Sequence, residues 1–208
     1  VVSLGSLIQG LVAWYVIHRF SSAILLKSAK DVLVFLLGGG IVTCMIASTI
    51  GVTALYYHGV LPGEYVFSTW LTFWLGDTLG VYIITPFLIV WSMAKWKKGG
   101  VKLWSLEAAF MAVGFLAITW ISLVKTYPLA DLFIPLSVWV AYRCGMHGTV
   151  LLNIAIALTS TILTSFGYGC LVAYFPDSAM LVLVGFVEII IGTALIVAAM
   201  INERVDVR

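Results

Sequence analysis

Long apolar segments separated by short polar stretches run through the whole chain. The longer segments approach or exceed the roughly 20 residues that a helix needs to cross a bilayer. Apolar residues fill them continuously and do not alternate with polar ones, so the pattern predicts helices and not membrane strands. The expected segments are 1–17, 32–57, 66–93, 106–124, 129–142, 149–166 and 179–201. The fold class is therefore predicted to be an all-α, polytopic membrane bundle with seven transmembrane helices.

Composition supports this class and removes most others. Of the 208 residues, 62% are hydrophobic and 10% are charged, which is far from the composition of a soluble domain. The three cysteines have no metal or redox spacing, and no phosphate loop, His-Glu-x-x-His or Gly-x-Ser-x-Gly motif is present. We therefore expect no catalysis, metal, cofactor or nucleic-acid binding in this chain, and a lipid bilayer as its surroundings.

The distribution of basic residues predicts the orientation. If all seven segments cross, one side holds ten of the eleven Lys and Arg residues and only Lys125 lies on the other. The ten are Arg19, Lys27, Lys30, Lys95, Lys97, Lys98, Lys102, Arg143, Arg204 and Arg208. By the positive-inside rule this side is cytoplasmic, so the C-terminus is predicted inside a bacterial inner membrane. Segment 129–142 is shorter than a normal span, and every later segment would invert if it were re-entrant.

Asp77 is the most informative polar residue, because it lies near the middle of segment 66–93. A charge at that depth normally faces a bundle interior or a wet cavity. Gly76 and Gly80 flank it with Gly-x-x-x-Gly spacing, which allows a neighbouring helix to approach closely. Pro86 has no N–H and can bend the helix one turn earlier. The two glycines and the proline are predicted to serve helix packing, and Asp77 is a candidate for sensing a signal.

Two further features extend the candidate sensing site. Trp70 and Trp74 precede Asp77 at helical spacing. They could line a pocket for a cationic or aromatic ligand, or they could simply pack in the core. Glu188 lies near the middle of segment 179–201, at a depth similar to that of Asp77. Two such carboxylates could bind a cation or meet the donors of a ligand, or could fix helix packing.

The roles of the other polar residues can be interpreted in more than one way. Gln9 and Asn153 are neutral amides, which commonly join helices in membranes. Arg143 lies at the cytoplasmic edge, where it could extend to the interface or pair with a carboxylate and couple the bundle to the cytoplasm. Glu203 and Arg204 come after the last segment and are candidates for the same coupling.

Three stretches carry a resemblance to a known family. Residues 70–86 read WLTFWLGDTLGVYIITP, residues 134–148 read IPLSVWVAYRCGMHG, and residues 202–204 read NER. They resemble, in turn, the Trp-Leu-Gly-Asp-x-x-Gly…Thr-Pro signature, the Pro…Trp-x-x-x-Arg-x-Gly-x-x-Gly region and the cytoplasmic exit of the first type of bacterial membrane-associated sensor (MASE) family. The family's Gly-Asp motif corresponds to Gly76 and Asp77, and its Arg to Arg143. Gln9 stands where an acid is common in the family.

The resemblance implies a sensory bundle joined to a cytoplasmic histidine kinase, diguanylate cyclase or cyclic-di-GMP phosphodiesterase, in two-component or cyclic-di-GMP signalling. We expect residues 1–208 to form one sensor domain that responds to a small molecule or a membrane protein. We also expect a further helix before it, an output domain after it and a homodimeric assembly. A transporter or substrate-binding membrane component with carboxylates at the midplane is the alternative. A plain membrane anchor is the third.

Overall fold

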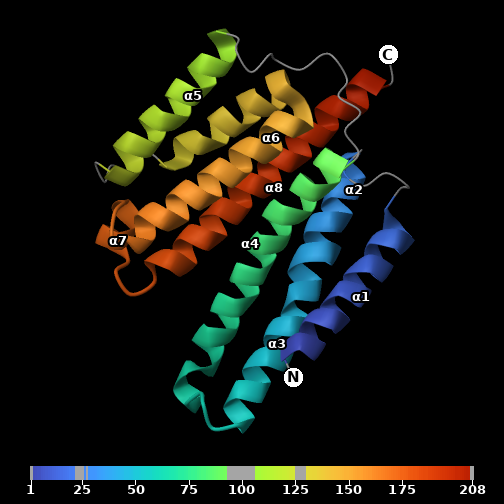
Figure 1. The fold of residues 1–208 in the computed structure, drawn as a ribbon, viewed down its shortest axis with the longest axis vertical. Helices are drawn as coiled ribbons and strands as arrows, with labels where there is room; N and C mark the ends of the chain where they lie inside the picture. The colour runs from blue at the N-terminus through green and yellow to red at the C-terminus, as the bar shows by residue number, and fades with distance from the viewer. Residues whose placement is uncertain (1, 22–25, 27, 93–105, 125–129, 207–208) are drawn as a thin grey trace. The chain divides into compact units, whose positions relative to one another are not determined.

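The computed structural model of the chain describes residues 2–21, 26, 28–92, 106–124 and 130–206, and these form helices joined by short turns and loops (Figure 1). The prediction of an all-α membrane protein is confirmed. Four helical stretches are long and apolar enough to cross a membrane, namely Ala29–Tyr57, Gly63–Ser92, Ala130–Ser165 and Ala179–Arg204. A fifth, Glu107–Ser122, is apolar but shorter. The remaining predicted membrane crossings stay predictions. Some basic residues used to predict the orientation lie outside the described residues, namely Lys27, those at 95–102, Lys125 and Arg208.

The chain forms two compact units, Val1–Tyr82 and Ile83–Arg208, which we call unit 1 and unit 2. The boundary falls within one continuous helix, α4 (Val66–Ser92). Helix α4 runs through Pro86, which removes one backbone hydrogen bond from the helix. The boundary between the units therefore falls in the turn that proline weakens.

Unit 1 has three long helices among its described residues, and the middle one is built in three parts. These parts are α2 (Ala29–Val34), the π-helical η1 (Phe35–Val42) and α3 (Thr43–Tyr57). Helix α1 (Val2–Phe20) packs against this middle helix, and a short 3₁₀ turn, η2 (Gly63–Tyr65), leads into α4. A π-helical stretch inside an α-helix is uncommon and is frequent at functional sites.

Two glycines of η1 mark where the neighbouring helices approach the middle helix. A methyl group at Gly38 would lie 2.6 Å from Cγ1 of Val16 on α1. A methyl group at Gly40 would overlap the ring of Tyr82 on α4. The absence of side chains at these positions lets the middle helix receive a neighbour on two sides, as small residues do in membrane bundles.

Unit 2 contains the C-terminal end of α4 and the remaining helices. In chain order these are α5 (Leu106–Thr119), the π-helical η3 (Trp120–Val124), the 3₁₀ turn η4 (Ala130–Leu132), α6 (Phe133–Ser165), α7 (Cys170–Tyr174) and α8 (Ala179–Asp206). The most extensive packing is between α6 and α8, where small residues such as Ala194 and Ala198 are fully buried. Small side chains let two membrane helices approach closely.

Helix α6 is sharply bent at Gly145, which has φ 61° and ψ −158°. Residues other than glycine rarely adopt this backbone conformation. The chain reverses at the bend, so α6 consists of two arms (Figure 1). At 1.5 Å per residue the first arm, 133–144, is about 18 Å long and the second, 146–165, is about 30 Å long. The predicted segments 129–142 and 149–166 correspond to these arms, and the first arm is as short as the sequence predicts.

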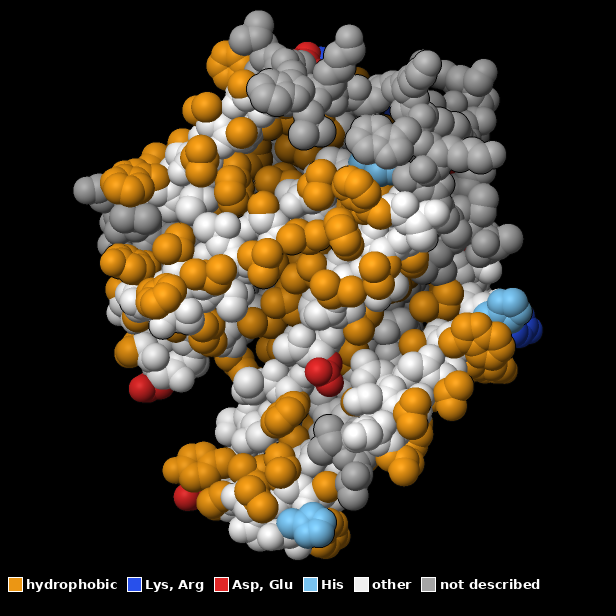
Figure 2. All heavy atoms as spheres, in the orientation of Figure 1, with side chains coloured by type: hydrophobic (Ala, Val, Ile, Leu, Met, Phe, Trp, Pro, Cys, Tyr) orange, Lys and Arg blue, Asp and Glu red, His pale blue; other side chains and the backbone are white. Residues whose placement is uncertain are grey.

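Much of the surface is apolar, as a lipid-facing surface must be. Hydrophobic side chains are spread over the described part of the face seen in Figure 2. Among the large apolar side chains that are exposed are Leu7 and Leu11 on α1 and Phe110, Val113 and Leu116 on α5. The exposed apolar positions of α5 recur at helical spacing, which indicates that one face of this helix is turned towards lipid.

Replacing Gly40 with alanine tests the approach of α4 to η1. The added methyl group meets the buried Tyr82 ring, so we expect the free energy of unfolding to fall by about 1–3 kcal/mol. For a chain of this length, Tm in detergent micelles should fall by about 2–12 °C. Gly10→Ala is the matched control, because no described atom lies within 4 Å of a methyl group there. Equal losses in both variants would contradict the contact of the Tyr82 ring with Gly40.

Candidate functional site

The two tryptophans of the candidate site hold α4 against the middle helix of unit 1. The indole N–H of Trp70 donates a hydrogen bond to Oγ1 of Thr49 on α3, at 3.0 Å. The indole N–H of Trp74 donates to the carbonyl oxygen of Ile41 in η1, also at 3.0 Å. The two rings stack with centroids 5.4 Å apart. This arrangement is the one expected of packing residues in a membrane, where each polar group needs a partner.

Tyr82 continues the same face of α4, two turns after Trp74. Its hydroxyl donates a 2.7 Å hydrogen bond to the carbonyl oxygen of Leu36, and the side chain is buried. Its ring lies 6.0 Å from that of Phe35. Leu36 and Ile41 both belong to the π-helical stretch, so α4 donates side-chain hydrogen bonds to η1 at two places. The sequence did not single out Tyr82, although its spacing from Trp70 and Trp74 by multiples of four is a signal that could have done so.

Asp77 lies seven residues after Trp70 and three after Trp74, so it is a neighbour of both tryptophans on the surface of α4, whereas Tyr82 lies further round the helix. Thr78, on the inner face, is buried, whereas Gly76, Asp77 and Gly80 are exposed. No described atom lies within 4 Å of a methyl group placed at either glycine. Among the described residues, the Asp77 carboxylate has no hydrogen bond or ion pair. The structure therefore gives each indole a partner on the middle helix and leaves Asp77 exposed. The sensing role of these three residues and the packing role of the two glycines stay predictions.

Glu188 belongs to unit 2, so it is described separately from Asp77. Its Oε1 atom is buried and has no hydrogen-bond partner among the described residues. Its neighbours Val187 and Ile190 are almost fully buried. Asn153 on the second arm of α6 is also buried, and its Oδ1 has no partner among the described residues either. The interior of unit 2 thus contains two acceptors that can receive hydrogen bonds from water or a ligand.

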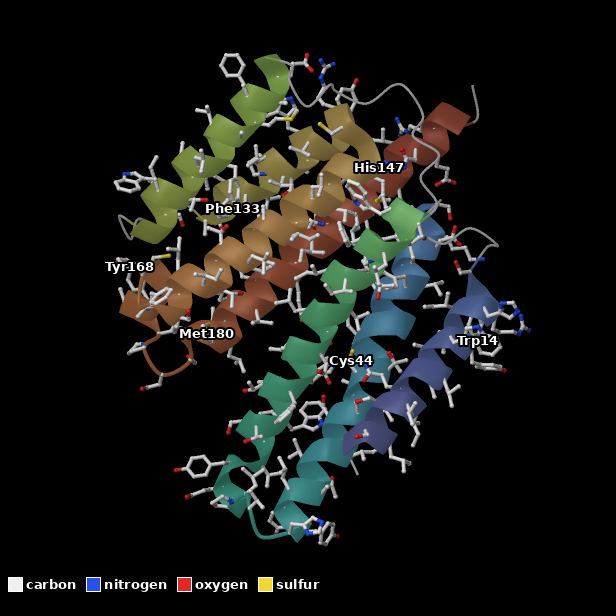
Figure 3. All side chains as sticks on the ribbon, viewed as in Figure 1. Trp14, Cys44, Phe133, His147, Tyr168 and Met180 are labelled. Carbon is white, nitrogen blue, oxygen red and sulfur yellow. The ribbon has the colours of Figure 1, made fainter. Side chains whose placement is uncertain are left out.

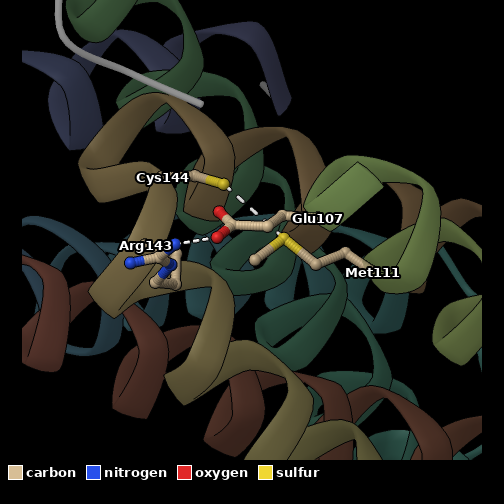
Figure 4. A network of polar contacts seen from close by, with 4 residues as sticks. All are labelled: Glu107, Met111, Arg143 and Cys144. Carbon is tan, nitrogen blue, oxygen red and sulfur yellow. Dashed lines mark hydrogen bonds and ion pairs between the residues drawn. The ribbon is translucent and has the colours of Figure 1, made fainter. Parts of the chain in front are cut away.

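The bend of α6 is tied to the start of α5. The guanidinium of Arg143 forms an ion pair and hydrogen bond with the carboxylate of Glu107, and the Cys144 thiol lies 3.6 Å from the Met111 sulfur (Figure 4). Both charged side chains are 43% exposed, so the ion pair contributes only about 0–1 kcal/mol to stability. Its consequence is mainly geometric, because it fixes where the first arm ends relative to α5.

The end of α8 lies beside the same bend. A methyl group at Gly145 would be 3.8 Å from Oδ1 of Asn202, which immediately precedes the exposed Glu203 and Arg204. The start of α5, the bend of α6 and the exit of α8 therefore lie at one end of unit 2. Figure 3 shows His147 at this end, and Phe133, Tyr168 and Met180 at the other. Pro86, the remaining predicted packing residue, is buried in α4.

Asp31 is a buried carboxylate that the sequence reasoning missed. It is 1% exposed and accepts hydrogen bonds from the Ser28 backbone N–H and hydroxyl, in a capping box at the start of α2. Its other oxygen accepts a 2.9 Å hydrogen bond from the Ser21 hydroxyl, directly after α1. The Ser-x-x-Asp spacing is the sequence signal that could have identified it. Asp31 joins the end of α1 to the beginning of the middle helix.

A pocket in unit 2 contains none of the predicted site residues. It lies between the second arm of α6, α7 and α8, and its polar side chains are the buried Ser160 and Thr164 and the thiol of Cys170. The rest of the lining is apolar, with Phe133, Leu183 and Val187 among its members. Within the described part of the chain, no group of three or more His, Cys, Asp or Glu residues is placed to hold a metal ion.

The chain has apolar helices of membrane length, with carboxylates and amides between the helix ends. This combination is typical of a polytopic membrane protein with polar sites in its bundle. The MASE1 family model matches residues 1–205, so the chain belongs to the MASE1 family. Members of this family are membrane sensory domains of signalling proteins and are not catalytic themselves. The match confirms the resemblance seen in residues 70–86, 134–148 and 202–204. No curated protein and no solved structure gives a match to the chain.

The Tyr82 hydroxyl provides a test of how α4 is held. Tyr82→Phe removes the donor to Leu36 and leaves a buried carbonyl with one hydrogen bond fewer, so we expect a loss of about 0.5–1.5 kcal/mol in the free energy of unfolding. Tyr57→Phe is the matched control, because Tyr57 is 81% exposed. Chemical unfolding in detergent should show the loss for Tyr82→Phe alone. Identical midpoints for the two variants would show that this hydrogen bond does not hold α4.

Proposed function

We propose that this chain is the signal-input domain of a bacterial signalling protein, and that α8 carries its signal to a cytoplasmic output domain. The output is a histidine kinase, a diguanylate cyclase or a cyclic-di-GMP phosphodiesterase, as the family resemblance implies. The observation that carries the proposal is the position of the α8 exit beside the bend of α6. A long helix that leaves the bundle next to a bend is suited to pass a displacement onward.

The relay is proposed to work through the bend. Arg143 and Glu107 connect the first arm of α6 to α5, and Gly145 lies close to Asn202 on α8. A ligand or partner that binds one arrangement of the helices better than another shifts the population towards that arrangement. A shift of α5 or of the first arm then reaches Asn202, and Glu203 and Arg204 carry it towards the output domain.

The placement of charges supports an inner-membrane protein with a cytoplasmic C-terminus. In unit 2, Arg143, His147 and Arg204 lie at one end, and Asp177 comes after α7 at the other. In unit 1, Arg19 and Lys30 lie beside the Ser21–Asp31 contact, whereas His58 and Glu64 lie at the opposite end, between α3 and α4. Within each unit the basic ends agree with the positive-inside rule. Output modules of these classes commonly act as dimers, so we propose a homodimer.

The relay predicts a dependence on helical phase. Each residue inserted after Arg204 rotates the output domain by about 100°. Inserting two alanines rotates it by about 200°, and we expect the output activity of the intact protein to change by about fivefold or more. Inserting seven alanines returns the phase to within about 20°, so output should stay near that of the original protein. The measurement is the activity of the output domain in membranes.

The two insertions control for one another, because the longer one disturbs the linker more but the phase less. A gradual loss with linker length would contradict a rigid relay. Equal output for both insertions would favour a plain anchor, which has no need of helical phase.

A transporter is retained as a second candidate because of one observation, the buried acceptors of Glu188 and Asn153 that lack partners among the described residues. A midplane carboxylate is typical of a transport site. If unit 2 transports a cation, Glu188→Gln should abolish uptake of that cation into proteoliposomes. The sensory proposal instead predicts no uptake in the original protein, with Na⁺ and K⁺ as the probes.

A further inference from the structure

Two sulfur atoms meet where α5 contacts the bend of α6. The Cys144 thiol, on the last residue of the first arm, donates a hydrogen bond to the thioether sulfur of Met111 on α5, at 3.6 Å (Figure 4). Met111 is 7% exposed, whereas Cys144 is only partly buried. The thioether is therefore held in the interior of unit 2, and the thiol stays accessible. The sequence predicts no metal site here, because 33 residues separate the two side chains.

The spacing of the two sulfurs suits a single soft cation. A thiolate and a thioether are ligands that select Cu⁺, whereas hard cations select oxygen ligands. With metal–sulfur bonds of roughly 2.3 Å, two sulfurs 3.6 Å apart subtend an angle of about 100° at the metal. A closed-shell ion such as Cu⁺ imposes no geometry through its d electrons. One cation can therefore bind both sulfurs with little movement of either helix.

The charges around the two sulfurs favour a monovalent cation. Glu107 and Arg143 form an ion pair next to Cys144, so their charges cancel (Figure 4). A cation that binds the Cys144 thiolate replaces the thiol proton, which leaves to solvent. Exchange of H⁺ for Cu⁺ keeps the net charge of the site unchanged. A divalent cation would add a positive charge next to the Arg143 guanidinium, which is unfavourable.

The other two cysteines have different surroundings. Cys44 is buried in unit 1 and accepts a hydrogen bond from the side-chain amide of Gln9. Cys170 is buried in the apolar pocket of unit 2. Neither residue therefore combines an accessible thiol with a thioether, as Cys144 does.

We propose that Cys144 and Met111 form a binding site for Cu⁺, with the thiolate of Cys144 and the thioether of Met111 as ligands. Each cation bound releases one proton. The bound cation joins the start of α5 to the end of the first arm of α6, beside the Glu107–Arg143 ion pair. The proposal concerns binding alone and does not rest on the proposed sensory function.

The experiment uses the full chain in detergent, incubated without oxygen with Cu⁺ and an excess of reduced glutathione. Glutathione competes successfully with a single protein thiol, so only a pair of ligands on the protein retains the cation. The ratio of copper to protein is measured by elemental analysis after desalting. We expect about one Cu⁺ per chain, and no retention of Zn²⁺ under the same conditions, because the ligands are soft.

Three variants identify the ligands. Cys144→Ser should abolish retention of Cu⁺. Met111→Leu conserves the volume of the side chain but leaves a single thiol, so the affinity for Cu⁺ should fall by about tenfold or more. Cys170→Ser is the matched control, because it removes a buried thiol beside α7 at the other end of unit 2 and should retain Cu⁺ as the original protein does. Size-exclusion chromatography shows that each variant is folded.

X-ray absorption at the copper edge counts the sulfur neighbours directly. The original protein should show one more sulfur ligand on Cu⁺ than Met111→Leu does. This comparison does not depend on Cys144→Ser, so the proposal stays testable if that variant does not fold.

Three results would overturn the proposal. The first is the absence of bound Cu⁺ on the original protein in excess glutathione. The second is an unchanged affinity in Met111→Leu, and the third is a loss of Cu⁺ from Cys170→Ser as large as that from Cys144→Ser. None of them involves the output domain, so a failed metal site and a failed relay can be told apart.

Discussion

The architecture of unit 1 depends on hydrogen bonds from α4 side chains to the π-helical stretch of the middle helix. In a bilayer no water is available to satisfy a displaced backbone carbonyl, so the partner must come from the protein. Trp74 and Tyr82 supply donors to Ile41 and Leu36, and Gly40 leaves the space in which the tyrosine ring lies. The same contacts fix the rotation of α4 and leave Asp77, three residues after Trp74, exposed. The packing tryptophans and the candidate sensing residue are thus neighbours on one helix.

Unit 2 meets a different requirement, because in the proposed function it connects the bundle with the output domain. Gly145 allows α6 to reverse, and the reversal brings Arg143 to Glu107 and the bend to Asn202. Since the ion pair is half exposed, it positions these elements more than it stabilises them. The buried acceptor atoms of Glu188 and Asn153, which have no partner among the described residues, lie away from this end and can accept hydrogen bonds within the bundle. A bundle held by small residues and few polar contacts can change its arrangement at modest energetic cost.

Apolar length and charge placement were sufficient to predict the helical membrane class, because both are written directly in the sequence. The motif at 70–86 was sufficient to identify the family. The partners of the two indoles were not predictable, because the helical spacing of Trp70, Trp74 and Asp77 does not show which neighbouring helix the tryptophans contact. Glu107 was missed as the partner of Arg143 because 36 residues separate them in the sequence. The short length of segment 129–142 was visible in the sequence. The reversal of the chain after it was not, because that depends on the backbone conformation of a single glycine, Gly145.

Asp77 is proposed to serve the input and not the fold. The most direct measurement compares Tm in detergent with output activity in membranes for the intact protein carrying Asp77→Asn. We predict that Tm changes by no more than about 1–2 °C, as expected for an exposed position, while the response of the output domain is lost or locked in one state. A large fall in Tm would show that Asp77 holds the bundle together, and an unchanged response with unchanged Tm would show that Asp77 carries no signal.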